Sequence, residues 1–272
     1  MDIISSKKFS YIVCPKCRKK LSVSGNTLKC ADGHSFDIAS CGYVNLLPPH
    51  KTGDVPGDSK EMVRARRDFL SKGYYKPLAH RLYEIIKGYQ PDIIADIGCG
   101  EGYYTSGMGA FGAHVMGFDI SKYALMYAAK RDKASDYCTA NLHDIPLADN
   151  TADMAVCCFC AHDEHEFARI LKENGKLITV LPAKRHLFGL KEILYDKPYE
   201  NTEGNETMEY FCLVEEDRVE YTVDIDCTDD IMNLFSMTPY FWKTSKDGVD
   251  RLKAMSHLNT ELGFVIRTYI KR

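Results

Sequence analysis

The sequence predicts an α/β protein with an open sheet of the nucleotide-binding kind and a small metal-binding module ahead of it. An apolar run at residues 93–97 breaks into glycines at every second position, which is typical of the first strand and turn of such a sheet. Apolar runs and helical patterns then alternate toward the C-terminus. Near the N-terminus, cysteines and a histidine stand at the spacing of a metal site.

The composition limits the class of protein. A chain of 272 residues with 45% hydrophobic content can hold one sizeable α/β domain plus a small module. It contains no 18-residue apolar run, and its N-terminus lacks the apolar core of a signal peptide. We therefore expect no membrane span, and we expect the eleven cysteines to be reduced thiols or metal ligands of a cytoplasmic protein.

Charge is spread unevenly along the chain. Residues 1–90 hold 16 basic and 8 acidic side chains, a balance of +8. Residues 91–272 hold the other 35 − 16 = 19 basic and 38 − 8 = 30 acidic side chains, a balance of −11. A basic front on an acidic body suggests that the N-terminal third contacts a polyanion. A solvated, lysine-rich surface would give the same count, so both interpretations stay open.

Four residues near the N-terminus form the pattern C-x2-C-x12-C-x3-H, which fits a tetrahedral Zn²⁺. They are Cys14, Cys17, Cys30 and His34. Residues 19–23 and 27–29 flank a glycine turn and predict a hairpin between the two pairs. Such a module has too few apolar residues to fold alone, and structural zinc supplies roughly 10–16 kcal/mol. Because protein fills all four positions, we interpret the zinc as structural. Cys41 is a competing ligand at a poorer spacing.

The glycine turn has the form D-x-G-x-G-x-G, which differs from the dinucleotide spacing. Glu101 in this turn would repel phosphate, whereas a cationic sulfonium tolerates it. A second apolar run at 113–118 ends in Asp119, an acid suited to ribose hydroxyls. This pattern resembles the S-adenosylmethionine (SAM) methyltransferases, although a glycine turn without a ligand is the alternative. The expected cofactor-binding residues here are Asp96, Gly98, Gly100, Glu101, Gly102 and Asp119.

The remaining pattern supplies the other elements. The expected helices cover residues 60–70, 78–87, 104–111, 122–131, 164–171, 187–195 and 229–235. The expected strands cover residues 93–97, 113–118, 135–140, 154–158, 175–181, 218–225 and 262–270. Residues 51–59 predict a linker, and the polar stretch 196–217 predicts a loop or excursion. The aromatic segment 237–242 either walls the active site or packs as a corner. Asn141 stands where many SAM enzymes carry an acid for the adenine amino group, and its amide oxygen can accept the same bond.

These residues divide the chain into three parts. Residues 1–50 form the zinc-binding module, with an irregular leader at 1–10 and an extended segment at 36–48. Residues 51–90 form the linker and the helices that lead to the sheet, and residues 91–272 form the methyltransferase domain.

Taken together, the chain resembles the guanine-N1 methyltransferases that act on 23S ribosomal RNA. The matching stretches are the zinc pattern and residues 34–37, 42–48, 56–59, 66–70, 73–78, 96–105, 184–187 and 237–239. The resemblance implies a Rossmann-like class I SAM-dependent methyltransferase sheet, structural zinc, and an RNA-recognition role for the N-terminal module. It also implies SAM contacts at Tyr75, Gly100, Glu101 and His186. Without it, Tyr75 could pack under a helix and His186 could cap a helix at the surface.

One stretch departs from the family. Where the family usually presents a Tyr-x-Pro-like segment facing the target base, this chain has Phe159-Cys160-Ala161 after Cys157 and Cys158. Without the proline and the hydroxyl, the orientation of the substrate stays open. The cysteines are either small buried thiols in a strand or ligands of a second metal.

The expected reaction moves the SAM methyl to N1 of a guanine in a hairpin loop of 23S ribosomal RNA, and N1 must lose its proton. Residues at the carboxyl ends of strands could act as the base, and the sequence does not choose among His143, Asp144, His162 and Asp163. The zinc module and Arg64, Arg66 and Arg67 would hold phosphates. A methyltransferase of a small molecule or protein and a non-enzymatic RNA-binding protein are the competing classes. A homodimer is one option for the oligomeric state.

Overall fold

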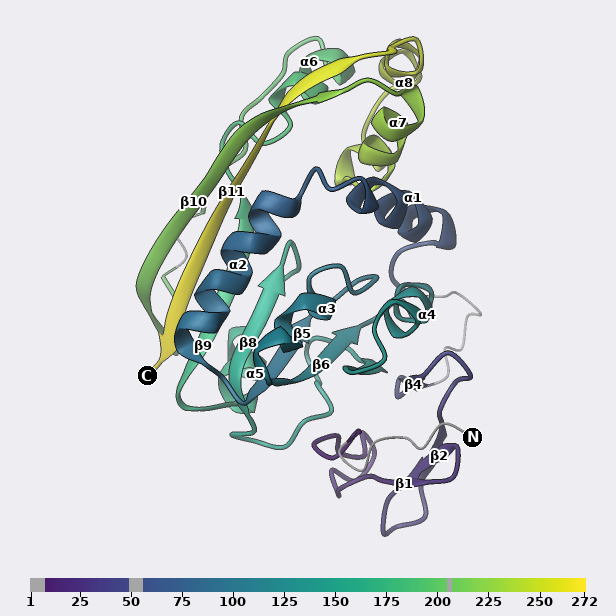
Figure 1. The fold of residues 1–272 in the computed structure, drawn as a ribbon, viewed down its shortest axis with the longest axis vertical. Coiled ribbons are helices and arrows are strands. Elements are labelled where there is room, and N and C mark those ends of the chain that lie inside the picture. The colour runs from purple at the N-terminus through teal and green to yellow at the C-terminus, as the bar shows by residue number, and fades with distance from the viewer. Residues whose placement is uncertain (1–7, 49–55, 205–206) are drawn as a thin grey trace.

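The computed structural model describes residues 8–48, 56–204 and 207–272 (Figure 1). It has an eight-stranded sheet in the order β10-β11-β9-β8-β5-β6-β7-β4 and a separate three-stranded sheet, β1-β2-β3. The small sheet consists of β1 (Ser22–Ser24), β2 (Thr27–Lys29) and β3 (Ser35–Asp37). The large sheet consists of β4 (Tyr43–Asn45), β5 (Ile93–Ile97), β6 (His114–Asp119), β7 (Asp136–Thr139), β8 (Ala152–Cys158), β9 (Leu171–Pro182), β10 (Phe211–Ile225) and β11 (Leu258–Lys271).

Eight α-helices are found within the described ranges. They are α1 (Lys60–Ser71), α2 (Lys76–Tyr89), α3 (Thr105–Met108), α4 (Lys122–Arg131), α5 (Glu164–Ile170), α6 (Phe188–Leu194), α7 (Thr228–Ser236) and α8 (Lys246–Lys253). Two 3-10 turns, η1 (Gly109–Phe111) and η2 (Pro239–Trp242), follow α3 and α7. Ser59 caps α1 and Ser121 caps α4, because each side-chain oxygen accepts a backbone N–H of the first turn.

The strand order reverses beside β5. The chain proceeds outward from β5 to β6 and β7, and then returns to the other side of β5 with β8 and β9. These strands run parallel, whereas at the far edge β11 pairs antiparallel with β9, and β10 pairs antiparallel with β11. Every residue of β5 is buried, as expected for a strand covered on both faces. Ligands of open α/β sheets bind at the carboxyl ends of the strands at such a reversal.

The segment that leaves the zinc module becomes an edge of the large sheet. The extended stretch expected at 36–48 contains β4, which pairs in parallel with β7. The backbone N–H of Leu46 donates to Thr139 Oγ1 at 2.9 Å, just past the paired residues. This pairing covers the row of backbone groups that β7 would otherwise present as an open edge.

The expected irregular leader is wrong for the part that the structure describes. Phe9 is buried, its N–H donates to Asp136 Oδ2 at 2.8 Å, and Lys8 Nζ donates to the carbonyl of Ser135. A buried aromatic ring and a buried carboxylate therefore hold this segment against the start of β7. Residues 1–7 of the leader and 51–55 of the expected linker lie outside the described residues.

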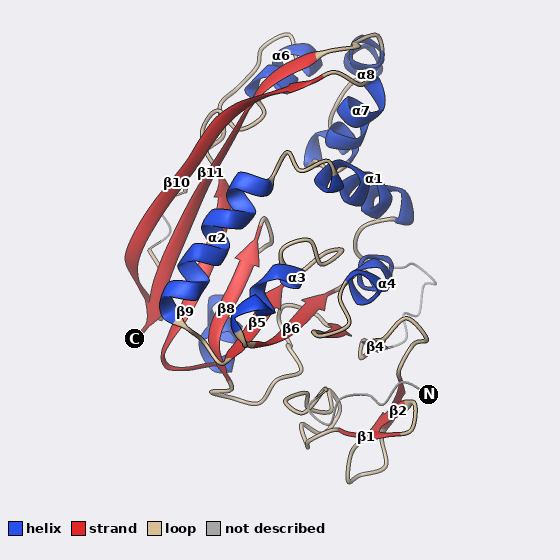
Figure 2. Cartoon of the chain, viewed as in Figure 1, coloured by secondary structure: helices blue, strands red, loops and turns tan. Residues whose placement is uncertain are grey.

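The C-terminal half departs most from the expected elements. The polar excursion expected at 196–217 ends earlier, because β10 begins at Phe211, and α8 falls where no helix was expected. Much of β10 alternates between partly buried and exposed side chains, and its polar face conceals a strand. The helix expected at 104–111 is a short α3 followed by η1. Figure 2 shows β10 and β11 running past the rest of the sheet toward α6, α7 and α8.

Three apolar clusters are found among the described residues, and one of them extends into the zinc module. It joins Ile12, Leu21 and Leu28 of the module to Ile145 and Leu147 of the loop after β7. Ile12 and Leu147 also form an antiparallel backbone bridge. The zinc module is therefore packed onto the sheet domain through a shared core.

Candidate active site and metal centre

The four predicted metal ligands come together in the structure. The sulfurs of Cys14, Cys17 and Cys30 and Nδ1 of His34 all lie within 4.8 Å of one another. Individual separations are 3.6 Å between the Cys17 and Cys30 sulfurs, and 3.5 and 3.4 Å from His34 Nδ1 to the Cys14 and Cys30 sulfurs. Tetrahedral zinc with Zn–S of about 2.3 Å and Zn–N of about 2.0 Å requires edges of this length. The residues present therefore fit a zinc ion, and Cys41 stands outside the group.

Asp96 lies below the glycine turn, where β5 ends. It is buried, and its Oδ2 accepts the hydroxyl of Thr105 at 2.6 Å. Burial raises the pKa of Asp96 to about 7, and the nearby Asp119 carboxylate acts in the same direction. Asp96 therefore organises the turn from beneath by holding the first residue of α3.

The three glycines of the turn have different structural roles. A Cβ at Gly98 would stand 2.5 Å from the Cys160 sulfur, and a Cβ at Gly102 would stand 2.9 Å from the Ala128 side chain of α4. Gly100 has a left-handed φ of +55°, and among the described residues a Cβ there would meet only Arg66 Nη1, at 4.0 Å. Gly98 and Gly102 allow close packing inside the protein, whereas Gly100 leaves room for a ligand.

The Asp119 carboxylate is fixed at the edge of this turn. Its Oδ2 accepts the Gly100 N–H at 2.9 Å and its Oδ1 accepts the Ser121 N–H at 2.7 Å. Burial raises the pKa of Asp119, and these two backbone bonds oppose that effect. Each oxygen keeps a second lone pair. The contact to ribose hydroxyls stays a prediction.

Glu101 is buried rather than presented at the surface of the turn. Arg131 of α4 lies 2.8 Å from its carboxylate. Burial raises the pKa of Glu101, and Arg131 lowers it. Because Arg131 balances its charge inside the protein, Glu101 does not by itself favour a cationic cofactor.

Tyr75 and His186 meet from positions 111 residues apart. Tyr75 is the N-cap of α2, and its hydroxyl lies 3.5 Å from His186 Nε2. The Gly263 N–H donates to His186 Nδ1 at 3.3 Å, which leaves Nε2 as the protonated nitrogen of a neutral ring. Burial lowers the pKa of His186 to about 3. His186 is therefore not the surface helix cap that the sequence left open.

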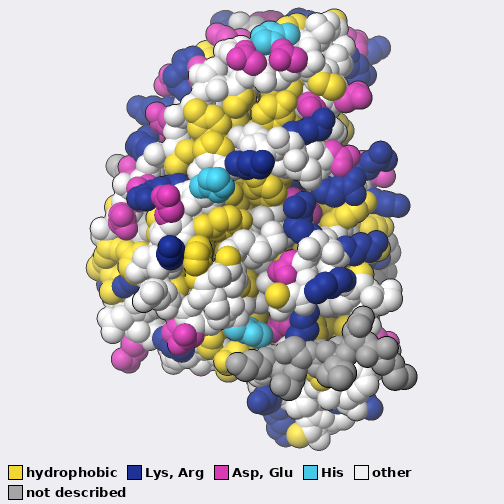
Figure 3. Space-filling view, viewed as in Figure 1, with side chains coloured by type: hydrophobic (Ala, Val, Ile, Leu, Met, Phe, Trp, Pro, Cys, Tyr) yellow, Lys and Arg dark blue, Asp and Glu magenta, His cyan; other side chains and the backbone are white. Residues whose placement is uncertain are grey.

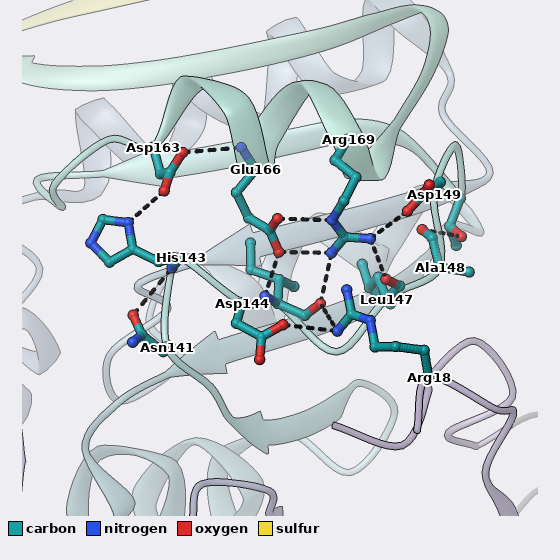
Figure 4. A network of polar contacts seen from close by, with 12 residues as sticks. Arg18, Asn141, His143, Asp144, Leu147, Ala148, Asp149, Asp163, Glu166 and Arg169 are labelled. Atoms are coloured by element: carbon teal, nitrogen blue, oxygen red, sulfur yellow. Dashed lines mark hydrogen bonds and ion pairs between the residues drawn. The ribbon is translucent and has the colours of Figure 1, made fainter. Parts of the chain in front are cut away.

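Asn141 begins the loop 141–149 after β7 and is exposed. Its side-chain oxygen accepts the backbone N–H of His143 at 3.1 Å. Figure 4 shows this turn beside the contact between His143 Nδ1 and the Asp163 carboxylate. The Asn141 amide oxygen thus shapes its own loop, and its contact with adenine stays a prediction.

The four candidate bases differ in what they touch, and the His162 ring lies 6.2 Å from that of Phe167. Asp163 accepts the Glu166 N–H as the N-cap of α5 and also pairs with His143. Partial burial raises the pKa of Asp163, but the bonds from His143 and the Glu166 N–H outweigh it and leave the pKa below its usual value. Asp144 is ion-paired to Arg18 of the zinc module at 3.0 Å.

The cysteines of β8 are packed thiols. The Cys157 sulfur lies 3.7 Å from the carbonyl oxygen of Cys160 and 3.8 Å from that of Ala161. In the described part of the chain the only group of three or more potential ligands within reach of one metal ion is the zinc set. The alternative of a second metal therefore has no support in the geometry.

All three arginines of the basic cluster on α1 have a carboxylate partner, but they differ in exposure. The Arg64 side chain is 73% exposed and lies 3.6 Å from Asp68 Oδ2, whereas Arg67 pairs with Asp68 and stacks on Tyr127 at 4.7 Å. Arg66 pairs with Asp58 and lies beside the glycine turn. Figure 3 shows Lys and Arg side chains gathered along the edge formed by α1 and α4.

The aromatic segment 237–242 was expected either to wall the active site or to pack as a corner, and it has features of both. Tyr240 is buried as in a packed corner, whereas Phe241 and Trp242 are exposed, Trp242 by 71%. The carbonyl of Met237 lies 3.5 Å from Arg66 Nη2, so the segment begins next to the turn.

Comparison with known proteins decides the family. A curated 23S rRNA (guanine(748)-N(1))-methyltransferase from Streptomyces fradiae is 32% identical over 252 residues, which is 89% of this chain and 89% of that protein. The chain belongs to the 23S rRNA (guanine-N1)-methyltransferase family. A putative member from Bacillus subtilis (strain 168) is 32% identical over 265 residues, or 91% of this chain and 92% of that one.

Two family models agree with this membership. The model described as "RlmA, N-terminal", a zinc ribbon, matches residues 12–53, and the model described as "Methyltransferase domain" matches residues 95–179. The predicted Rossmann-like class I SAM-dependent methyltransferase sheet with an N-terminal zinc module is confirmed. SAM and structural zinc are the cofactors, and the protein is a methyltransferase of class EC 2.1.1. No helix among the described residues is long and apolar enough to cross a bilayer.

Sequence reasoning missed two features of the site. Arg66 of α1 reaches the glycine turn and pairs with Asp58, although Arg66 was expected to hold phosphate. Arg131 balances Glu101 from the last turn of α4. In the sequence, each of these two arginines stands beside other basic residues, and that pattern does not show toward which part of the protein a side chain points.

Proposed function

We propose that this protein transfers the methyl group of SAM to N1 of a guanine in a hairpin loop of 23S ribosomal RNA. The observation that carries the proposal is the 32% identity, over about nine tenths of both chains, with the Streptomyces fradiae enzyme. Two further features support it. The zinc cluster precedes the glycine turn in the chain, as expected, and one apolar core joins the zinc module to β5, the strand that leads into the turn. In the alternative, a small-molecule or protein methyltransferase, the N-terminal zinc ribbon would recruit a partner rather than bind the substrate.

The cofactor residues proposed here belong to the end of β5 and its glycine turn, to the ends of β6 and β7, and to the Tyr75–His186 contact. They are Tyr75, Asp96, Gly98, Gly100, Glu101, Gly102, Asp119, Asn141 and His186. When bound, SAM supplies an electrophilic methyl on a sulfonium, so its leaving group needs no acid. The neutral His186 adds no positive charge that would repel that sulfonium. Its Nε2–H is directed at the Tyr75 oxygen, which leaves the Tyr75 hydroxyl proton free to be donated.

His143 is the candidate base that the contacts favour. Asp163 holds the His143 Nδ1 position, which leaves Nε2 as an acceptor for a proton. Asp144 is committed to Arg18, and Asp163 is committed to the α5 N-cap. The N1 of a paired guanine is out of reach, so the base must be unpaired or flipped out.

Three further expectations belong to this proposal. The division into residues 1–50, 51–90 and 91–272 would separate RNA recognition from methyl transfer. The cytoplasm is where a ribosomal RNA substrate is met. The option of a homodimer stays a prediction that sedimentation velocity at working concentration would test.

The proposal is tested by incubating unmodified 23S transcript with the protein and SAM, followed by primer extension. Methylation at N1 blocks base pairing, so a new stop one nucleotide before a guanine is expected. A reaction without SAM is the control. Extension that reads through the whole transcript after prolonged incubation would contradict the proposal.

A further inference from the structure

Arg66 extends from α1 toward the cofactor turn rather than toward solvent. Its guanidinium is 4.0 Å from the position of a Cβ on Gly100 and 3.5 Å from the carbonyl of Met237. Its side chain is 29% exposed, compared with 73% for Arg64 two residues earlier. Neighbouring arginines of one helix are therefore placed in two different environments.

Asp58 orients this guanidinium. Arg66 Nη1 donates to Asp58 Oδ2, and the carbonyl of Asp58 accepts the Ser121 hydroxyl at 2.9 Å. A Cβ on the preceding Gly57 would stand 2.8 Å from Ile120 and 2.9 Å from Ser121, so only glycine fits at this position. The Asp58 segment is thus packed against the end of β6, directly beyond Asp119, and Arg66 is held between that segment and Gly100.

We propose that Arg66, oriented by Asp58, binds the carboxylate of the methionine end of SAM. SAM carries two positive groups, its sulfonium and its ammonium, and one negative group, its carboxylate. Among the charged groups of SAM, only the carboxylate attracts a guanidinium over the open face of Gly100. Arginine recognises carboxylates through two parallel N–H donors, which fixes orientation as well as charge.

This assignment adds a determinant of cofactor specificity to the proposed function and depends on its SAM site. It also separates Arg66 from the phosphate-binding role expected from the sequence. Because the carboxylate is recognised in the absence of RNA, binding of cofactor alone can test it, and a negative result would leave the proposed RNA substrate standing.

The experiment is calorimetric titration of the zinc-loaded protein with SAM and with decarboxylated SAM, without RNA. The wild type should bind SAM about 10- to 100-fold more tightly than decarboxylated SAM, which is the range expected for a charge-assisted hydrogen-bonded pair. Arg66→Met should remove most of that preference by weakening SAM and leaving decarboxylated SAM within about threefold. Arg66→Lys keeps the charge without the fork, and an intermediate preference is expected.

Arg64→Met is the matched control, since it removes an exposed arginine from the same helix. It should leave both affinities unchanged. The proposal is overturned if wild type binds the two cofactors equally, or if Arg66→Met and Arg66→Lys weaken both by the same factor. Circular dichroism of each variant identifies one that fails to fold, and Arg66→Lys then decides the question by itself.

Discussion

Arg18 of the zinc module donates to the Asp144 carboxylate at 3.0 Å and to the carbonyl of Ile145 at 3.3 Å. Asp144 belongs to the loop 141–149, which begins with the predicted adenine contact Asn141. Figure 4 shows Arg18 reaching this loop on one side while Arg169 of α5 holds it on the other. The Val13 N–H also donates to the carbonyl of Pro146 at 2.9 Å. The zinc module therefore supports a loop that is part of the proposed cofactor site.

Removal of zinc should weaken cofactor binding as well as RNA binding. Without the metal, the Cys17 knuckle that carries Arg18 loses its fixed shape, and the loop loses its support. The Arg18–Asp144 pair is exposed and contributes only about 0–1 kcal/mol by itself. We therefore expect Arg18→Ala to change the SAM affinity less than Cys17→Ser does. Titration with S-adenosylhomocysteine before and after a chelator measures this, and an unchanged affinity in zinc-free, folded protein would contradict it.

Gly98 should be intolerant of a side chain. Gly98→Ala places a methyl group 2.5 Å from the Cys160 sulfur at a left-handed φ of +71°. We expect a loss of about 2 kcal/mol or more of unfolding free energy, since strain and overpacking add. Gly112 is the matched control. Its φ is also left-handed, at +95°, but a Cβ added there would have no described atom within 4 Å apart from its chain neighbours. Gly112→Ala should lose only the strain, about 1 kcal/mol. Urea unfolding of both variants decides, and equal losses would refute the packing argument.

His186 should make stability fall in mild acid. Its folded pKa, about 3, lies below the unfolded value, so the unfolded chain binds the proton first as the pH falls. The stabilising effect is complete above about pH 6.5 and is lost progressively toward pH 3. Between pH 7 and 5, this group should account for about 2 kcal/mol of lost unfolding free energy. His186→Gln should show a correspondingly smaller change in urea titrations at the two pH values. An equal change in variant and wild type would show that His186 titrates normally.

His143 should be essential to turnover but not to cofactor binding. A general base contributes about 100-fold or more, so His143→Gln should lower kcat by that order with little change in the SAM affinity. Raising the pH should restore part of the rate, because hydroxide then removes the N1 proton. His165→Gln, on the neighbouring helix α5, serves as the control and should retain activity. A His143→Gln enzyme with wild-type kcat at neutral pH would remove His143 from the mechanism.

The sequence was sufficient where residue spacing alone decides the structure. The zinc set follows from four residues at fixed intervals, and the first strand and turn follow from an apolar run with three glycines. Spacing could not show that β4 would pair with β7, since three residues carry no pairing signal. Nor could it show that β10 begins at Phe211, because the exposed face of that strand is as polar as a loop.

The ion pairs around the candidate site could not be predicted from the sequence. Glu101, Asp58 and Arg66 are all visible in the sequence, yet their partners are set by tertiary packing. Arg66 differs from Arg64 only by the side of α1 on which it falls. A helix that contacts both α7 and α4 has no single buried face that periodicity can identify.

The most direct measurement is mass spectrometry of nucleosides from unmodified 23S transcript after incubation with the protein and methyl-labelled SAM. We predict label in 1-methylguanosine alone, at about one methyl group per transcript for a single target. Label in another nucleoside, or an RNA that stays unlabelled while the protein binds SAM, would contradict it.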